Sequence, residues 1–194
     1  MEKVYLAFQK AWNNKNSSFL SRIIAYWTMG PYSHVEIVFK DEEECGGWVM
    51  CSSLGTEGGV RCKPHIIDTN LYDYKELKVI SSAYIKKFFK QLIKNRTSYD
   101  FLAIVLSQLI KLGIDKNNKW FCSEAVARAL QISCSDIEDL WYVKTEQLSP
   151  NDLARIVGLI EYKNKPTRPS FICLLKNNME DIYKPFGITK INKW

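Results

Sequence analysis

The sequence predicts an α+β domain in which an antiparallel sheet packs against helices. Two observations lead to this fold class: strand patterns dominate residues 4–80, and helical patterns dominate the rest of the chain. The composition agrees with it, because 46% hydrophobic and 25% charged residues are ordinary values for a folded domain, and 194 residues suffice for a sizeable core.

The first half of the chain carries short runs rich in β-branched and aromatic residues, which are typical of strands. A helix is expected between the first two runs, at 17–27, with Ser17 or Ser18 as its cap. Gly30 and Pro31 then break the chain. The predicted strands are 4–8, 34–39, 48–52, 60–63 and 76–80.

The second half has apolar residues at helical spacing, with lysines between them. Another helix begins near Ser149, which caps it, followed by Pro150 at its first position. The chain after it has prolines spaced among basic residues, so we expect an extended segment. We therefore divide the sequence into a domain at 1–163 and a basic extension at 164–194 that packs on or wraps the domain. The other predicted helices are 83–95, 101–112 and 122–131.

The formal net charge is +6, and residues 163–194 contribute seven basic against two acidic residues. Such a tail suits contact with an anionic surface, although a solvated surface is the plainer explanation. The basic residues form no dense run, and no nucleic-acid-binding signature accompanies them. We therefore expect no specific nucleic-acid partner. The sequence leaves the oligomeric state open.

The six cysteines are irregularly spaced in a chain well above 100 residues, which argues against a disulfide framework. No pair has the Cys-x-x-Cys spacing of a zinc knuckle, so we expect neither a metal nor another cofactor. The N-terminal residues show no signal-peptide pattern, and no apolar run approaches the ~18 residues of a membrane span. Reduced cysteines and a cytoplasmic location are therefore expected.

The first motif with chemical meaning lies in the predicted strand 34–39. Side chains alternate along a strand, so His34 and Glu36 share one face while Val35 and Ile37 enter the core on the other. A carboxylate beside an imidazole holds one tautomer and stabilises the imidazolium. From this segment alone, a structural His–Glu pair on a half-solvated strand remains the alternative.

The second motif surrounds Cys122. Together with Val126, Ala129 and Leu130 it forms one helical face, which places Cys122 at the helix start on the inward side. The helix dipole and unpaired backbone N–H groups there favour a thiolate, and they also suit an oxyanion. A plain buried cysteine is the alternative. We expect Ser123 to cap this turn.

Taken together, the two motifs supply the minimal set for nucleophilic cysteine catalysis. The sequence resembles the permuted branch of the NlpC-type papain-like superfamily, which has bacterial and poxviral members. The resemblance covers roughly residues 1–160, and its pieces are Tyr5-Leu6-Ala7-Phe8, Tyr32-Ser33-His34-Val35-Glu36-Ile37, Tyr99-Asp100-Phe101, Phe121-Cys122-Ser123-Glu124 and Ser149-Pro150-Asn151-Asp152-Leu153. In unpermuted relatives the cysteine helix precedes the histidine strand. Here the histidine comes first, as the permuted branch requires.

The resemblance implies a papain-like fold with Cys122 as nucleophile, His34 as general base and Glu36 as third member. Backbone N–H groups of Cys122 and a neighbour are expected to bind the oxyanion. Other oxyanion or substrate candidates are Tyr32, Ser123 and Asp100. Packing beside Gly30-Pro31 is the alternative for Tyr32, and capping of the helix from Phe101 is the alternative for Asp100. His65 and the five other cysteines are expected to play no direct role.

The leading functional hypothesis is a thiol hydrolase of the peptidase or amidase type, which cleaves an amide or ester through an acyl-enzyme. The substrate class stays open among a peptide, a peptidoglycan fragment and an acyl lipid. An acyltransferase or lipase-like enzyme is the runner-up, since relatives with the permuted arrangement include lipid-directed acyltransferases. A non-catalytic binding or host-interaction module on the same fold is a second class, and a nucleic-acid binder is a third.

Overall fold

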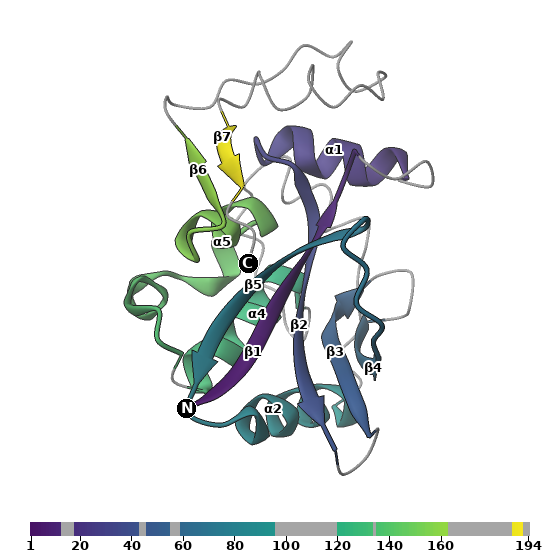
Figure 1. Ribbon diagram of the computed structural model, residues 1–194, viewed down its shortest axis with the longest axis vertical. Helices are drawn as coiled ribbons and strands as arrows, with labels where there is room; N and C mark the ends of the chain where they lie inside the picture. The colour runs from purple at the N-terminus through teal and green to yellow at the C-terminus, as the bar shows by residue number, and fades with distance from the viewer. Residues whose placement is uncertain are drawn as a thin grey trace.

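The computed structural model describes residues 1–12, 18–42, 46–54, 59–95, 120–133, 135–162 and 188–191. Within these ranges the chain has an α+β fold, as the sequence predicts. A five-stranded antiparallel sheet has the strand order β4-β3-β2-β1-β5, and four helices pack against it (Figure 1). This order places β4 and β5, which follow one another in the chain, at opposite edges of the sheet.

The strands of the main sheet are β1 (Glu2–Lys10), β2 (Tyr32–Asp41), β3 (Gly47–Leu54), β4 (Gly59–Pro64) and β5 (Tyr72–Val79). The helices are α1 (Phe19–Trp27), α2 (Ser82–Lys94), α4 (Cys122–Ile132) and α5 (Pro150–Ile156). Two 3-10 turns, η2 (Glu138–Tyr142) and η3 (Thr145–Gln147), connect α4 to α5. A small second sheet pairs β6 (Ile160–Tyr162) with β7 (Ile188–Ile191).

Serine side chains start three of the helices by accepting backbone hydrogen bonds. Ser18 accepts from the Ser21 N–H at 3.1 Å, which settles the choice of cap for α1. Ser149 and Asp152 form a reciprocal capping box with Pro150 in the first turn, so this predicted start is confirmed. The third is Ser81, at the start of α2.

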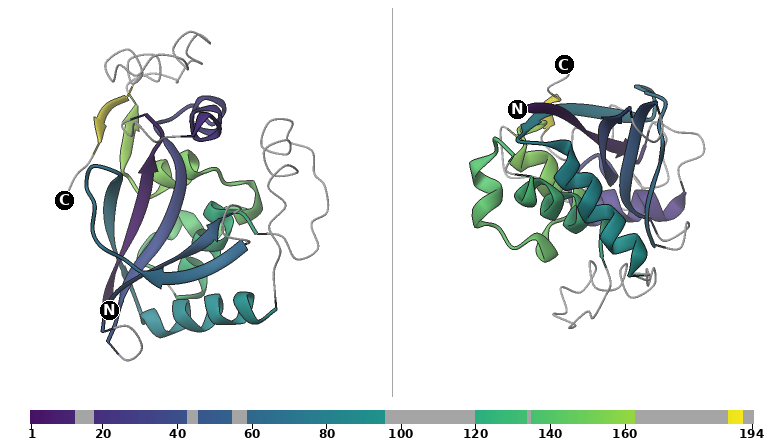
Figure 2. Two further views of the ribbon diagram at one scale, coloured as in Figure 1. Left: turned by 90° about the vertical axis from the view of Figure 1, so that its right-hand side faces the viewer. Right: turned by 90° about the horizontal axis from the view of Figure 1, so that it is seen from below.

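The main hydrophobic core lies between one face of the sheet and the helices α2, α4 and α5 (Figure 2). Strand alternation supplies its sheet side: Val35, Ile37 and Phe39 of β2 all lie in this core. A smaller cluster occupies the other face, where Val38 and Tyr74 are buried. One face of the sheet therefore contributes to the main core, and the other face also carries polar side chains.

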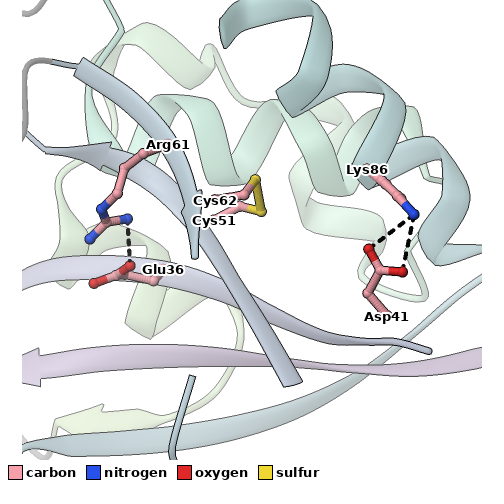
Figure 3. Close-up of a disulfide and its surroundings, with 6 residues drawn as sticks. All are labelled: Glu36, Asp41, Cys51, Arg61, Cys62 and Lys86. Carbon is pink, nitrogen blue, oxygen red and sulfur yellow. Dashed lines mark hydrogen bonds and ion pairs between the residues drawn. A yellow bond between two sulfur atoms is a disulfide. The ribbon is translucent and has the colours of Figure 1, made fainter. Parts of the chain in front are cut away.

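The cysteine prediction is wrong for Cys51 and Cys62, which form a disulfide between β3 and β4 (Figure 3). The antiparallel register pairs these two residues directly, with their Cα atoms 4.2 Å apart. The irregular spacing of cysteines along the chain does not reveal this proximity, because the strand register creates it. Cys45, Cys134 and Cys173 lie outside the described residues.

Several boundaries differ from the predictions. The strand expected at 76–80 is the longer β5, and the small sheet of β6 and β7 was not expected. Part of the predicted basic extension, 188–191, thus pairs with the end of the predicted domain. The predicted helix 101–112 lies outside the described residues. No described helix has the length and apolar character that a membrane crossing requires.

Candidate active site

Cys122 is the first residue of α4, as the helical pattern predicts, and it carries a buried free thiol. The turn is capped differently from the expectation. The Glu124 carboxylate accepts the Phe121 N–H at 3.2 Å, whereas the Ser123 hydroxyl donates to the Leu148 carbonyl. Ser123 therefore ties α4 to the chain beyond η3. The acidic side chain takes the capping role because it can reach back to the residue before the helix.

The β2–β3 ladder ends just before the segment that meets Cys122. Its last pair at this end joins Ile37 to Cys51. Beyond that pair the Ser52 hydroxyl donates to the Val35 carbonyl at 2.8 Å, and the Val35 N–H donates to the Cys122 sulfur. The end of the ladder thus lets the start of α4 lie against the backbone of β2.

His34 connects the thiol to a carboxylate. Its imidazole shares a hydrogen bond with Cys122, and its Nε2 atom lies 3.4 Å from Glu36 Oε1. The second contact has ion-pair distance but poor hydrogen-bond alignment. Because Nε2 faces Glu36, Nδ1 is the nitrogen that remains for the sulfur. All three side chains are buried, with 5% exposure for His34, 2% for Glu36 and 8% for Cys122.

The electrostatics favour a thiolate–imidazolium pair. Burial opposes charge on both groups, but their mutual attraction outweighs it, lowering the pKa of Cys122 and raising the pKa of His34 to about 10. The backbone N–H groups of Val35 and Ser123 also donate to the sulfur, which further lowers the thiol pKa. The proton therefore rests on the imidazole at neutral pH.

Glu36 has three partners. Arg61 donates to Oε2 at 2.8 Å, while His34 and the Tyr72 hydroxyl each lie 3.4 Å from Oε1. Burial alone would raise the pKa of Glu36, but hydrogen bonds and charges of His34 and Arg61 lower it to about 2. The carboxylate is therefore ionised at neutral pH and next to the imidazolium.

The remaining predicted site residues lie elsewhere or have other partners. Tyr32 is fully buried, and its hydroxyl donates to Asp73 Oδ2 at 3.0 Å, so the structure gives its oxyanion role no support. Asp100 lies outside the described residues. His65 has another partner, since its Nε2 atom lies 2.9 Å from the Tyr74 hydroxyl.

Asn151 is a supporting residue that the motif analysis did not single out. It is fully buried, and its amide pairs with both the N–H and the carbonyl of Tyr32, at 3.0 and 2.8 Å. A side chain on Gly30 would collide with Asn151, since an added Cβ would lie 2.2 Å from its Oδ1 atom. The start of β2, two residues before His34, is therefore held by α5.

Sequence reasoning also missed Arg61 and Tyr72. Each comes from a strand at an edge of the sheet, β4 or β5, and reaches Glu36 near the middle. Arg61 lies within the predicted strand 60–63, where alternate side chains share a face, and this alternation was the only sequence signal for it. Arg61 meets Glu36 because of the strand order, and local sequence patterns do not specify strand order.

The comparisons add no relative: neither the protein-family models nor the curated proteins contain a match to this chain. The described residues also contain no group of three or more side chains suited to hold a metal ion. Function is therefore argued from the site itself.

Proposed function

We propose that this protein is a cysteine-nucleophile hydrolase that cleaves an amide or ester bond through an acyl-enzyme. The observation that carries this proposal is the buried Cys122–His34 pair, with the thiol at a helix start and its pKa lowered by the imidazolium. An inert core cysteine has no such partner. The chain has two histidines, and the one that meets the thiol also contacts a carboxylate.

The reaction follows from these positions. The Cys122 thiolate attacks the substrate carbonyl carbon, and a carbon–sulfur bond forms as the carbonyl electrons move to oxygen. The Cys122 backbone N–H, which has no intrahelical acceptor at the first position of α4, donates to this oxyanion. The oxyanion electrons then re-form the carbonyl, and the bond between the carbonyl carbon and the leaving nitrogen or oxygen breaks as the His34 imidazolium gives that atom its proton. A thioester on Cys122 remains.

Deacylation reverses the proton movement. Neutral His34 takes a proton from water, the resulting hydroxide attacks the thioester, and Cys122 leaves as a thiolate. Glu36 stabilises the imidazolium in both halves of the cycle because it stays ionised beside the ring. An acyltransferase uses the same first half, with another nucleophile in place of water, and it remains the second candidate.

The papain-like, permuted architecture also belongs to this proposal. It is supported by the order of the parts, with the histidine strand β2 before the cysteine helix α4, on an antiparallel sheet. We further propose a peptide, amide or acyl-lipid substrate, with no cofactor. The cytoplasmic location proposed from the sequence loses the support of reduced cysteines, because Cys51 and Cys62 form a disulfide. A non-catalytic module on this fold would have no need of an ionised thiol.

The test is site-resolved labelling with a thiol-reactive acyl ester at pH 6, read by peptide mass spectrometry. We expect rapid acylation of Cys122, its loss in Cys122→Ala, and at least a hundredfold slower acylation in His34→Ala. His65→Ala is the matched control and should label like the parent chain. Acylation of Cys122 no faster than that of the other thiols would contradict the proposed nucleophile.

A second step separates hydrolysis from acyl transfer. Peptide, amide and acyl-lipid substrates are incubated with the protein in water alone and with added amine or alcohol acceptors, with Cys122→Ala as the blank. Release of the free acid in water supports the hydrolase. Product that forms only with an acceptor supports the acyltransferase and overturns hydrolysis as the main reaction.

A further inference from the structure

Three buried side chains and one largely buried side chain form a connected set, which we call the buried charge cluster: Cys122, His34, Glu36 and Arg61. Cys122 shares a hydrogen bond with His34, and His34 Nε2 lies next to Glu36 Oε1. Arg61 donates a hydrogen bond to Oε2 of the same carboxylate. The Arg61 side chain is 12% exposed and that of Glu36 is 2% exposed. Charges buried to this degree are costly unless opposite charges compensate them.

The charges of the cluster balance only when Arg61 is counted. With a thiolate and an imidazolium, the cluster holds two negative and two positive charges. Without Arg61 it would carry an uncompensated negative charge, and the simplest relief is proton uptake by Cys122. Arg61 suits the balancing role because a guanidinium stays charged at every pH of interest.

The fold holds Arg61 in place through its neighbours. Arg61 lies on β4 directly opposite Ser52 of β3, and the next residue, Cys62, is bonded to Cys51 (Figure 3). The edge strand that carries Arg61 is thus covalently attached to β3, and the guanidinium reaches across β3 to Glu36 on β2. An edge strand without such a link would hold its side chains less firmly.

We propose that Arg61 is a positioning residue that keeps the nucleophile of this site ionised, by balancing Glu36 within the buried charge cluster. The inference rests on the proposed function, because it concerns the same thiol. It differs from a merely structural ion pair in one respect: Arg61 and His34 occupy opposite oxygens of one carboxylate. A change at Arg61 therefore reaches Cys122 through two intermediate groups.

Three other titratable groups near the cluster, Tyr72, Tyr74 and His65, are uncharged at neutral pH, whereas the charges of Lys63 on β4 and of Asp68 act on His65. Burial raises the pKa of Tyr72 and of Tyr74 on β5, and burial lowers the pKa of His65 in the β4–β5 connection. The Tyr72 hydroxyl, 3.4 Å from Glu36, is the nearest of them and contributes a polar contact without charge. Arg61 thus supplies the positive charge that contacts Glu36 Oε2, at 2.8 Å.

The experiment measures the rate of Cys122 alkylation by iodoacetamide from pH 4.5 to 9.5 in the full chain, resolved by peptide mass spectrometry. In Arg61→Met we expect the midpoint of the rate–pH profile to rise by about one unit, so that below the parent's midpoint the rate is about tenfold lower. Arg61→Lys keeps the charge and should stay within about threefold of the parent. Lys86→Met is the matched control: it removes the cation of the Lys86–Asp41 pair, which lies outside the cluster, and should change the rate less than twofold.

The double variant Arg61→Met/Glu36→Gln gives the decisive readout. Removal of both opposite charges leaves a thiolate and an imidazolium that balance one another, so the double variant should react faster than Arg61→Met, but below the parent because its imidazolium has lost the support of Glu36. A structural role predicts the reverse, with the double variant no faster than Arg61→Met. Thermal unfolding checks that each variant is folded, and Arg61→Gln replaces Arg61→Met if the latter is not.

The outcomes separate the two proposals. If Cys122 of the parent chain titrates like an ordinary thiol, near pH 8.5, the proposed function fails before Arg61 is considered. If the midpoint of the parent profile lies well below 8.5 and the midpoint of Arg61→Met lies at the same pH, only the role of Arg61 is overturned. Slow reaction in Arg61→Met with partial recovery in the double variant supports both.

Discussion

Two groups of buried ionic side chains lie on the same sheet, and they differ in how completely their atoms are paired. The first, the Lys10 cluster, consists of Lys10, Asp73 and Tyr32. Lys10 Nζ lies 3.1 Å from Asp73 Oδ1 and donates to the Thr69 carbonyl at 2.7 Å. Tyr32 donates to the other Asp73 oxygen at 3.0 Å. Both carboxylate oxygens therefore have a partner within 3.1 Å.

The buried charge cluster is less completely paired. His34 Nε2 lies 3.4 Å from Glu36 without a well-aligned hydrogen bond, and one proton is shared between His34 and Cys122. In a low-dielectric interior, full pairing fixes charges in place, whereas incomplete pairing leaves protonation sensitive to the surroundings. We therefore expect the Lys10 cluster to stabilise the fold and the buried charge cluster to take part in the proposed reaction.

The largest effect on stability is expected from Asp73→Asn. This change leaves the buried ammonium of Lys10 without its counter-charge, a loss that costs about 3–5 kcal/mol in buried pairs. Urea unfolding at pH 7 measures it. The alkylation rate of Cys122 in the folded protein should change less than twofold, because Asp73 belongs to the other cluster.

Glu76→Gln is the control for this prediction. It weakens the pair of exposed Lys3 with half-buried Glu76 on the same two strands, β1 and β5. Because the Gln oxygen can still accept from the Tyr5 hydroxyl, the unfolding midpoint should move little. A midpoint for Asp73→Asn as close to the parent as that of Glu76→Gln would refute the structural assignment. A tenfold change in Cys122 alkylation would show that the two clusters are coupled.

A smaller effect, with a pH signature, is expected from Glu36→Gln. The pKa of Glu36 is about 2 in the folded protein, below its ordinary value of 4.5. Protonation therefore favours the unfolded chain, so this stabilisation is complete above about pH 4.5 and is lost as the pH falls toward 2. Between pH 6 and pH 3 the difference in unfolding free energy between parent and variant should shrink by about 2 kcal/mol.

Urea titrations of both proteins at several pH values provide this measurement. Comparison of the two proteins cancels the carboxylates that they share, including Glu2 and Glu76, whose pKa values are also lowered by hydrogen bonds. A difference that stays constant from pH 6 to pH 3 would mean that Glu36 has an ordinary pKa. The buried charge cluster would then lack an ionised third member.

The sequence contained the parts that follow local rules. Strand alternation separated Val35 and Ile37 from Glu36, helical spacing placed Cys122 at a helix start, and the Ser149 cap marked α5. Each of these depends on neighbours within a few residues. The fold class follows from the same patterns, since they give the type and order of the elements.

The remaining contacts depend on strand order and register, which local patterns do not specify. Arg61 meets Glu36, and Cys51 meets Cys62, because β4, β3 and β2 are adjacent and in a particular register. Lys10 meets Asp73 because β1 lies beside β5. In each pair at least ten residues intervene, and nothing in the intervening sequence indicates the contact.

The smallest predicted effect concerns Tyr32, where the sequence and the structure lead to different roles. As an oxyanion donor, Tyr32 would have to direct its hydroxyl at the substrate. In the structure the hydroxyl donates to Asp73, and the ring packs against Phe8 with centroids 5.2 Å apart. We therefore expect Tyr32→Phe to behave as a member of the Lys10 cluster.

Loss of one hydrogen bond to a buried carboxylate should cost about 1–2 kcal/mol, measured by urea unfolding. Acylation of Cys122 should change less than twofold, because the ring and its packing remain. A rate loss of tenfold or more without a change in stability would return Tyr32 to the oxyanion site. It would also mean that the hydroxyl leaves Asp73 when substrate binds. Because the variant removes a single oxygen atom, its two readouts separate catalysis from structure more cleanly than any larger change at this position.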